Sequence, residues 1–315
     1  MLATAVAGCG GEKPYKVGLI IKQDTNPFFR DIRKTTERLA ARDGLDLDVL
    51  VGHSDVDNLS QVLAIGSMVR AGAKGILITP VSSRGVVPGV EQARKAGVTV
   101  IALDTPTDPE SAANALFATD NRRAGELIGR YARAKAAELG LVPKIAMLDL
   151  APGIATGAQR HEGFLKGFGI AEGDPRIAGT ANTAGDEVKG RVAMARLLRA
   201  NPDINVVYTV NEPAAFGAAA ALRAAGKSPS GVILVSVDGG CQAIRRGVRR
   251  GLIDATAQQY PGAMARGGVA ALAALARGGH RPSGYHDTGV ELITADPAPK
   301  VDSHGVAYGL RHCWG

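Results

Sequence analysis

Apolar and polar positions alternate along the chain in blocks that predict strands and helices in turn. Short apolar runs predict buried strands, and they occur at Val17–Ile21, Leu47–Val51, Ile76–Thr79, Val98–Leu103 and Ala115–Ala118, then at Ile145–Leu150, Arg176–Gly179, Val206–Val210, Ile233–Val237 and Ile253–Ala257. Helices are predicted between them, at Ser60–Ala71, Val86–Ala96, Gly157–Phe168, Glu187–Ala200, Ala214–Ala225 and Gln242–Arg250. Such alternation is typical of parallel sheets covered by helices on both faces, so the two sets predict two α/β units in tandem.

Composition supports a folded protein and argues against two classes of function. The chain has 315 residues, of which 45% are hydrophobic and 21% charged, so it can bury two cores. No apolar run approaches the ~20 residues that span a membrane. The net charge is +7, but its densest group, Arg245–Arg250, precedes Gly251 as at the C-terminus of a helix. We therefore expect a solvated face there and no nucleic-acid partner.

The N-terminus contains a candidate signal for export from the cytoplasm. Residues Val6–Cys9 resemble the lipobox of bacterial lipoproteins, in which the cysteine is acylated after cleavage. A charged first segment and a longer apolar core are missing, so the start is truncated or misassigned, or the motif is a chance match in an alanine-rich tail. We expect residues 1–15 to be a lipoprotein-like segment and Cys9 to be a lipidation site.

The stretch Asp24–Phe29 is the most informative part of the chain. It follows a predicted strand and opens a helix, with Pro27 at the first helical position. Only 4% of the residues are aromatic, yet Phe28 and Phe29 stand together beside this polar loop. Neighbours on a helix are roughly 100° apart, so we do not expect both rings in one core. At least one ring is then free to stack on a ligand, for which a sugar is the best candidate.

Planar polar side chains follow nearly every predicted strand. In open parallel sheets, ligands bind outside the carboxyl ends of the strands. The side chains at those ends are Asn26, Asp104, Arg160, Asn211, Glu212, Asp238, Gln258 and Gln259. Carboxylates, amides and guanidinium groups can hold adjacent hydroxyls in pairs, which suits a polyhydroxyl ligand. Alternatives remain for single residues, because Asp104 could cap a turn and Asn211 could cap the next helix.

Signatures of catalysis are missing from the sequence. It contains no GxGxxG, no phosphate-binding loop, no nucleophile elbow and no CxxC or HxxxH pair. The six histidines are scattered without the spacing of metal ligands. Asp104 and His161 could pair as base and orienting residue, but no nucleophile is evident. We expect a binding protein without metal or cofactor, not an enzyme.

Several motifs together resemble a known family. The segments Thr25–Phe29, Phe117–Asn121, Asn211–Gly217 and Val237–Gly240 resemble ribose-type periplasmic binding proteins. The segments Leu148–Gly153, Gln258–Pro261 and Cys313–Gly315 are similar to the fructose-binding components of bacterial ABC importers. The likeness extends over residues 16–315, nearly the whole chain.

The resemblance implies two Rossmann-like lobes joined by three crossing segments, the type I periplasmic binding protein fold. Residues 16–119 and 260–287 would form the first lobe, and 120–259 with 288–315 the second. The sugar would lie between them, against Asn26, Phe28, Phe29 and Asp104 of the first lobe, Arg160, Asn211 and Asp238 of the second, and Gln259 at a crossing. The implied protein is a monomer outside the cytoplasmic membrane, held only by lipid, that delivers its sugar to an ABC permease.

Two departures from the ribose pattern bear on which sugar is bound. Thr105 stands where ribose binders commonly have an arginine, and Gly185 stands where they place an aromatic residue. Loss of a cation and a ring would leave room for a different sugar, so we expect fructose first, then mannose or ribose. Sugar-responsive repressors share the lobes but need a helix-turn-helix, for which the residues before the first strand are too few. A sugar, quorum-signal or chemotaxis sensor with the same cleft remains the alternative.

The remaining two cysteines form a candidate disulfide. With Cys9 taken by lipid, Cys241 and Cys313 are left as a pair in an oxidising compartment. The family's crossing order returns the tail to the second lobe, which brings Cys313 toward Cys241. Two buried free thiols are the alternative.

Overall fold

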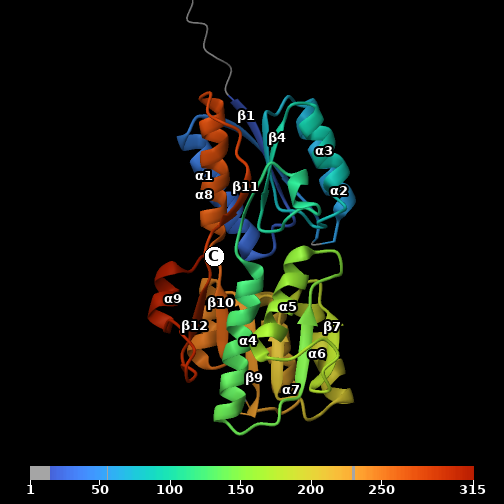
Figure 1. Ribbon diagram of the computed structural model, residues 1–315, viewed down its shortest axis with the longest axis vertical. Coiled ribbons are helices and arrows are strands. Elements are labelled where there is room, and N and C mark those ends of the chain that lie inside the picture. The colour runs from blue at the N-terminus through green and yellow to red at the C-terminus, as the bar shows by residue number, and fades with distance from the viewer. Residues whose placement is uncertain (1–14, 55, 229–230) are drawn as a thin grey trace, which may run out of the picture.

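The protein consists of two α/β lobes stacked along its long axis (Figure 1). The computed structural model describes residues 15–54, 56–228 and 231–315, so the predicted lipidation site Cys9 lies outside the described residues. Within these residues each lobe has a six-stranded sheet. The first sheet has the order β11 (Gly284–Asp287), β5 (Ala115–Ala118), β4 (Thr99–Leu103), β3 (Gly75–Ile78), β1 (Tyr15–Ile21) and β2 (Leu45–Val51). The second has the order β12 (Glu291–Thr294), β10 (Ala255–Gln258), β9 (Ile233–Asp238), β8 (Val206–Thr209), β6 (Ile145–Asp149) and β7 (Ile177–Asn182).

Strand direction confirms the predicted class with one exception. All neighbouring strands are parallel except β12, which pairs with β10 in the antiparallel direction. The central strands β3 and β4 are buried along their whole length, as expected for a parallel sheet covered on both faces.

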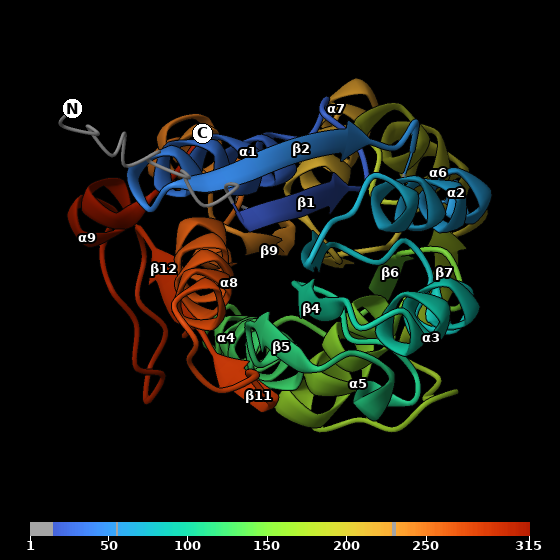
Figure 2. The same ribbon diagram turned by 90° about the horizontal axis from the view of Figure 1, so that it is seen from above.

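Pairs of helices cover both faces of each sheet. In the first lobe, α1 (Pro27–Arg42) and α8 (Pro261–Ala276) lie on one side, and α2 (Asn58–Arg70) and α3 (Val87–Lys95) on the other (Figure 2). In the second lobe the pairs are α4 (Asn121–Glu138) with α5 (Ala155–Phe168), and α6 (Glu187–Ala200) with α7 (Glu212–Ala224). Each pair closes a separate hydrophobic core against its sheet.

Among the described residues, six elements were not predicted from the pattern: α4, α8, α9 (Val306–His312), β11, β12 and the 3-10 turn Glu110–Ala112. Helix α8 is nearly apolar all round, and β11 is exposed at every position, so neither shows the expected periodicity. The helix predicted at Gln242–Arg250 is instead a π-helical turn, Ala243–Gly247, followed by a 3-10 turn, Val248–Arg250. It ends as predicted at Gly251, whose φ is +66°.

The chain passes between the two sheets three times, after β5, after β10 and after β11, as far as the described residues show. We keep as a proposal the lobe boundaries 16–119 with 260–287 and 120–259 with 288–315. The extreme C-terminus does not belong to the second lobe alone, because Trp314 packs within the core of the first lobe beside Phe28. Figure 1 shows the C-terminus between the lobes.

Candidate functional site

Polar residues of both lobes face each other where the carboxyl ends of the two sheets meet. Asp104 follows β4 and Asp238 ends β9; burial raises the pKa of Asp238, and the charge of Asp104 adds to this shift. The lobes touch directly, since the Ser83 N–H donates to the Gly153 carbonyl at 3.1 Å and the Ala155 N–H donates to the Ser83 hydroxyl at 3.1 Å. The structure therefore represents a closed arrangement of the lobes.

Lys22 supplies a cation to the first-lobe side that sequence reasoning missed. It follows β1, and its side chain is only 4% exposed. Its Nζ donates to Thr105 Oγ1 at 2.9 Å and lies 3.5 Å from Asp104 Oδ2 and 5.4 Å from the ring centroid of Phe29. A cation from the end of another strand therefore lies beside Thr105, where the resemblance implied that one would be missing. A lysine placed directly after a buried apolar run was the available signal.

Arg160, Asp238 and Gln259 form one buried network on the second-lobe side. Arg160 donates from Nε to Asn121 Oδ1 at 2.8 Å and from Nη1 to the Val210 carbonyl at 2.9 Å, and Nη1 lies 3.5 Å from Asp238 Oδ1. Gln259 Nε2 donates to the same Asp238 oxygen at 2.7 Å. Burial raises the pKa of Asp238, and the Arg160 guanidinium opposes this shift. The arrangement can present one carboxylate and two planar donor groups to a ligand.

Close helix packing places Arg160 in this network. A Cβ atom added to Gly125 of α4 would lie 2.1 Å from the Arg160 carbonyl oxygen, and one added to Gly163 of α5 would lie 2.1 Å from the Arg122 carbonyl oxygen. Only glycines allow the two backbones to approach so closely. The approach brings Arg160 beside Asn121 at the start of α4.

The two predicted asparagines cap helices. Asn26 Oδ1 accepts the Phe28 N–H at 2.9 Å at the start of α1. Asn211 Oδ1 accepts the Ala214 N–H at 3.1 Å at the start of α7, while its Nδ2 donates to the Gly185 carbonyl at 3.1 Å. The capping alternative for Asn211 therefore describes the structure. Contact of either residue with a ligand stays a prediction.

The expectation that Phe28 and Phe29 cannot share one core is wrong. Both rings are buried in the same first-lobe cluster, with centroids 5.4 Å apart in an edge-to-face contact. The reason is a second packing surface: the Trp314 ring lies 5.3 Å from Phe28, so the start of α1 is covered from the tail as well as from α8. Stacking of either ring on a sugar stays a prediction.

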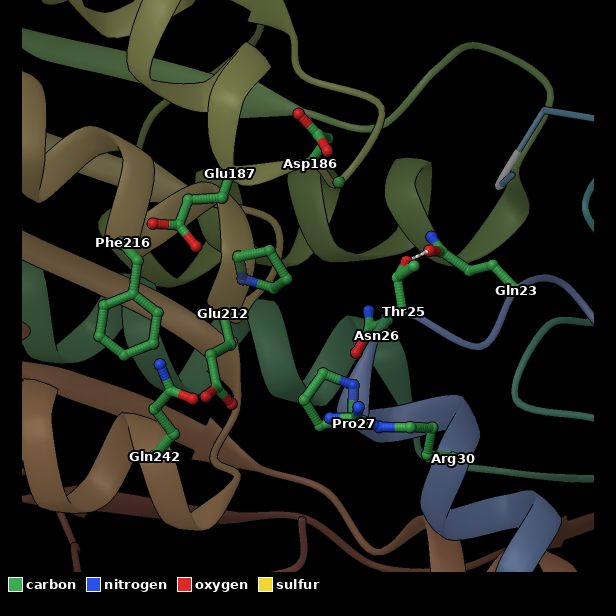
Figure 3. A pocket seen from close by; sticks show the side chains of 12 residues that line it. Gln23, Thr25, Asn26, Pro27, Arg30, Asp186, Glu187, Glu212, Phe216 and Gln242 are labelled. Atoms are coloured by element: carbon green, nitrogen blue, oxygen red, sulfur yellow. Dashed lines mark hydrogen bonds between the residues drawn. The ribbon is translucent and has the colours of Figure 1, made fainter. Parts of the chain in front are cut away.

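An open cavity of about 320 Å³ lies between the lobes, beside the network of Arg160, Asp238 and Gln259 (Figure 3). Its lining includes Asn26 and Arg30 of the first lobe and Glu212 and Phe216 of the second. Among the described residues, Asn26 is the one member of the predicted set that lines it. Glu212 was noted in the sequence but not selected as a site residue. Burial and the charge of Asp238 raise its pKa to about 8.

The sequence profile of the periplasmic binding protein domain matches residues 17–280. The chain belongs to the periplasmic binding protein family. Its relatives include the ribose import binding protein RbsB of Bacillus subtilis, which is 28% identical over 80% of this chain and 78% of that protein. The D-ribose/D-allose-binding protein of Pseudomonas aeruginosa is 28% identical over 90% of each chain. These relatives are binding proteins, in agreement with the expectation that this chain is not an enzyme.

Solved structures of solute-binding proteins share the fold of this periplasmic binding protein. One from Agrobacterium vitis with bound D-fucose is 25% identical, with a TM-score of 0.79 over 90% of this chain and 97% of that one. A galactofuranose binding protein has a TM-score of 0.82 over 95% and 98% of the two chains, at 22% identity. The family implies an extracytoplasmic location. None of the helices in the described segments is long and apolar enough to cross a membrane.

Proposed function

We propose that this chain is the solute-binding component of an ABC importer and encloses one monosaccharide between its lobes. The observation that carries the proposal is the buried network of Arg160, Asp238 and Gln259 on the second-lobe side, together with the buried carboxylate of Asp104 at the end of a first-lobe strand. Arg160 can donate to two hydroxyls, Asp104 and Asp238 can each accept from two, and the Gln259 amide group can donate and accept. Hydrogen bonds to charged groups contribute roughly 1.5–3 kcal/mol each, so a few exceed the cost of association and reach micromolar binding at about −8 kcal/mol.

An unused acceptor supports a ligand rich in hydroxyls. Gln259 Oε1 is buried and has no hydrogen-bond partner within the described residues, although its Nε2 is bound to Asp238. Buried polar atoms are normally paired, so this oxygen favours a ligand that donates a hydroxyl to it. An apolar ligand would leave the oxygen unsatisfied.

Fructose is the first sugar we propose, with ribose and mannose next. Thr105 and Gly185 depart from the ribose pattern, and Lys22 adds a donor beside Asp104 that differs in position from the arginine of that pattern. Relatives named for ribose and allose, and a similar structure with D-fucose, extend the panel to test. We also propose that the protein is a monomer tethered by lipid at Cys9, and that Asn26, Phe28, Phe29 and Asn211 complete the sugar contacts.

Calorimetric titration of the wild-type protein tests the proposal. The panel is fructose, ribose, mannose, allose and D-fucose, with a nucleobase and an amino acid as negative controls. We expect at least one sugar to bind with a Kd in the micromolar range, and small-angle scattering to show a smaller radius with sugar than without, because contacts from both lobes favour hinge closure. Binding of a control ligand, with no sugar bound below millimolar concentration, would overturn the proposal.

A further inference from the structure

Trp314 contacts three segments of the chain that carry residues of the proposed sugar site. It follows α9, which packs on β12 of the second lobe, yet its ring belongs to the core of the first lobe and is 8% exposed. Its Nε1 donates to the Gln259 carbonyl at 2.8 Å, on a segment that crosses between the lobes. Its ring meets Phe28 edge to face, with centroids 5.3 Å apart. One side chain from the tail therefore contacts both lobes and a crossing.

The turn that follows Asp238 packs closely against the same indole. A Cβ atom added to Gly240 would lie 3.2 Å and 3.3 Å from ring atoms Cζ3 and Cη2 of Trp314, which is tighter than ordinary contact. The N–H of Cys241 donates to the Trp314 carbonyl at 2.9 Å. The disulfide between Cys241 and Cys313, whose Cα atoms are 4.9 Å apart, links the residue after Gly240 to the residue before Trp314. The predicted bridge is thus present, and it fixes the register of the tail against the turn.

We propose that Trp314, held by the Cys241–Cys313 bridge, is a positioning residue for the sugar site. It sets the angle of the Phe28 ring and the place of the Gln259 and Asp238 side chains without touching the sugar. Phe28 is packed between Phe29 and the indole, so removal of the indole frees its ring to turn. This role rests on the proposed function, because it concerns how strongly and how selectively the same site binds.

The test compares sugar binding by wild type, Trp314→Ala and Trp314→Phe, using the tightest sugar of the calorimetric panel and a second, weaker one. We expect Trp314→Ala to raise the Kd about ten- to a hundredfold and to change the ratio of the two Kd values. Trp314→Phe keeps a ring against Phe28 but loses the donor to Gln259, so it should recover part of the affinity. The matched control is Phe168→Ala in the second-lobe core, where a ring that is 2% exposed is removed away from the cleft. It should lower thermal stability and leave both Kd values unchanged.

The indole also provides a spectroscopic readout, because Trp314 is the only tryptophan in the sequence. We expect its emission to change on sugar addition in the wild type. The double variant Cys241→Ser with Cys313→Ser should bind more weakly, with a smaller emission change, and it decides the question if Trp314→Ala does not fold.

The possible failures are distinguishable. Wild type that binds a sugar while the tryptophan and cysteine variants match it in Kd and selectivity would overturn the positioning role and leave the proposed function standing. A loss of affinity in Phe168→Ala as large as in Trp314→Ala would also overturn it, since the effect would then follow from stability alone. Wild type that binds no sugar would overturn both proposals.

Discussion

Replacing Asp238 by alanine should remove the group around which the second-lobe half of the site is organised. Its Oδ1 accepts from Gln259 Nε2 at 2.7 Å and lies 3.5 Å from Arg160 Nη1, while its Oδ2 accepts the Glu212 N–H at 3.3 Å. All of these groups are buried. Asp238→Ala therefore deletes proposed hydrogen bonds to the sugar and leaves a guanidinium and an amide without their acceptor.

Two magnitudes follow from this geometry. Leaving buried polar groups unpaired in a closed cleft costs roughly 2–4 kcal/mol of affinity, which is about a 30- to 700-fold rise in Kd. Breaking a buried ion pair by removing one partner costs roughly 3–5 kcal/mol of stability. The lower end applies here, because burial and then the charge of Asp238 raise the pKa of Glu212, so removal of Asp238 reduces the cost in stability that this raised pKa carries. Its φ of +107° disfavours alanine, so Asp238→Asn should be measured alongside.

Calorimetry and thermal unfolding separate the two effects when a matched control is included. Asp254 also carries a partly buried carboxylate held by a backbone donor, since its Oδ2 accepts the Leu234 N–H at 2.7 Å, but it lies at the start of β10, at the other end of the strand from the cleft. Asp254→Ala should lose stability and keep its affinity. Equal Kd values for wild type and Asp238→Ala, or equal losses in the two alanine variants, would show that Asp238 does not hold the sugar.

Three further predictions follow from single contacts. Gly125→Ala places a methyl group against the Arg160 carbonyl oxygen, so it should cost roughly 1–3 kcal/mol of stability and weaken sugar binding, and an unchanged Tm would contradict the packing argument. The free energy of unfolding should fall between pH 4.5 and about 8, because the native state keeps a proton on Glu212 that the unfolded state releases. In urea titrations at several pH values, Glu212→Gln should make this fall less steep. An identical pH dependence in wild type and Glu212→Gln would exclude Glu212 as its source. Lys22→Met removes the ammonium beside Asp104 and should raise the Kd about tenfold in calorimetry, whereas a Kd equal to that of wild type would exclude Lys22 from the site.

The sequence was enough to predict those features whose physical cause lies within one short segment. Asn26 and Pro27 are a cap and a first helical residue, and α1 begins at Pro27 as expected. Likewise, Asp104 and Asp238 each follow a short apolar run in the sequence, and the structure places them at the carboxyl ends of β4 and β9. Neither inference needed knowledge of contacts between distant parts of the chain.

Contacts between distant segments could not be predicted in the same way. Lys22 and Thr105 are 83 residues apart, and nothing near either one announces the hydrogen bond between them. At least one of Phe28 and Phe29 was expected to expose a face because a helix has one core side, but the partner of Phe28, Trp314, comes from the other end of the chain. In both cases the missing information was which segments the fold brings together.

The charges in the closed cleft explain why its ligand should carry hydroxyls on both sides. Asp104 and Asp238 come from opposite lobes; burial raises the pKa of Asp238, and the charge of Asp104 adds to this shift. Each carboxylate has a cation within its own lobe, since Lys22 Nζ lies 3.5 Å from Asp104 and Arg160 Nη1 lies 3.5 Å from Asp238. A ligand that donates hydroxyls to both carboxylates stabilises the closed state more than the open one, and only such a difference can shift the population of lobes toward closure. An apolar ligand of the same size would donate to neither carboxylate.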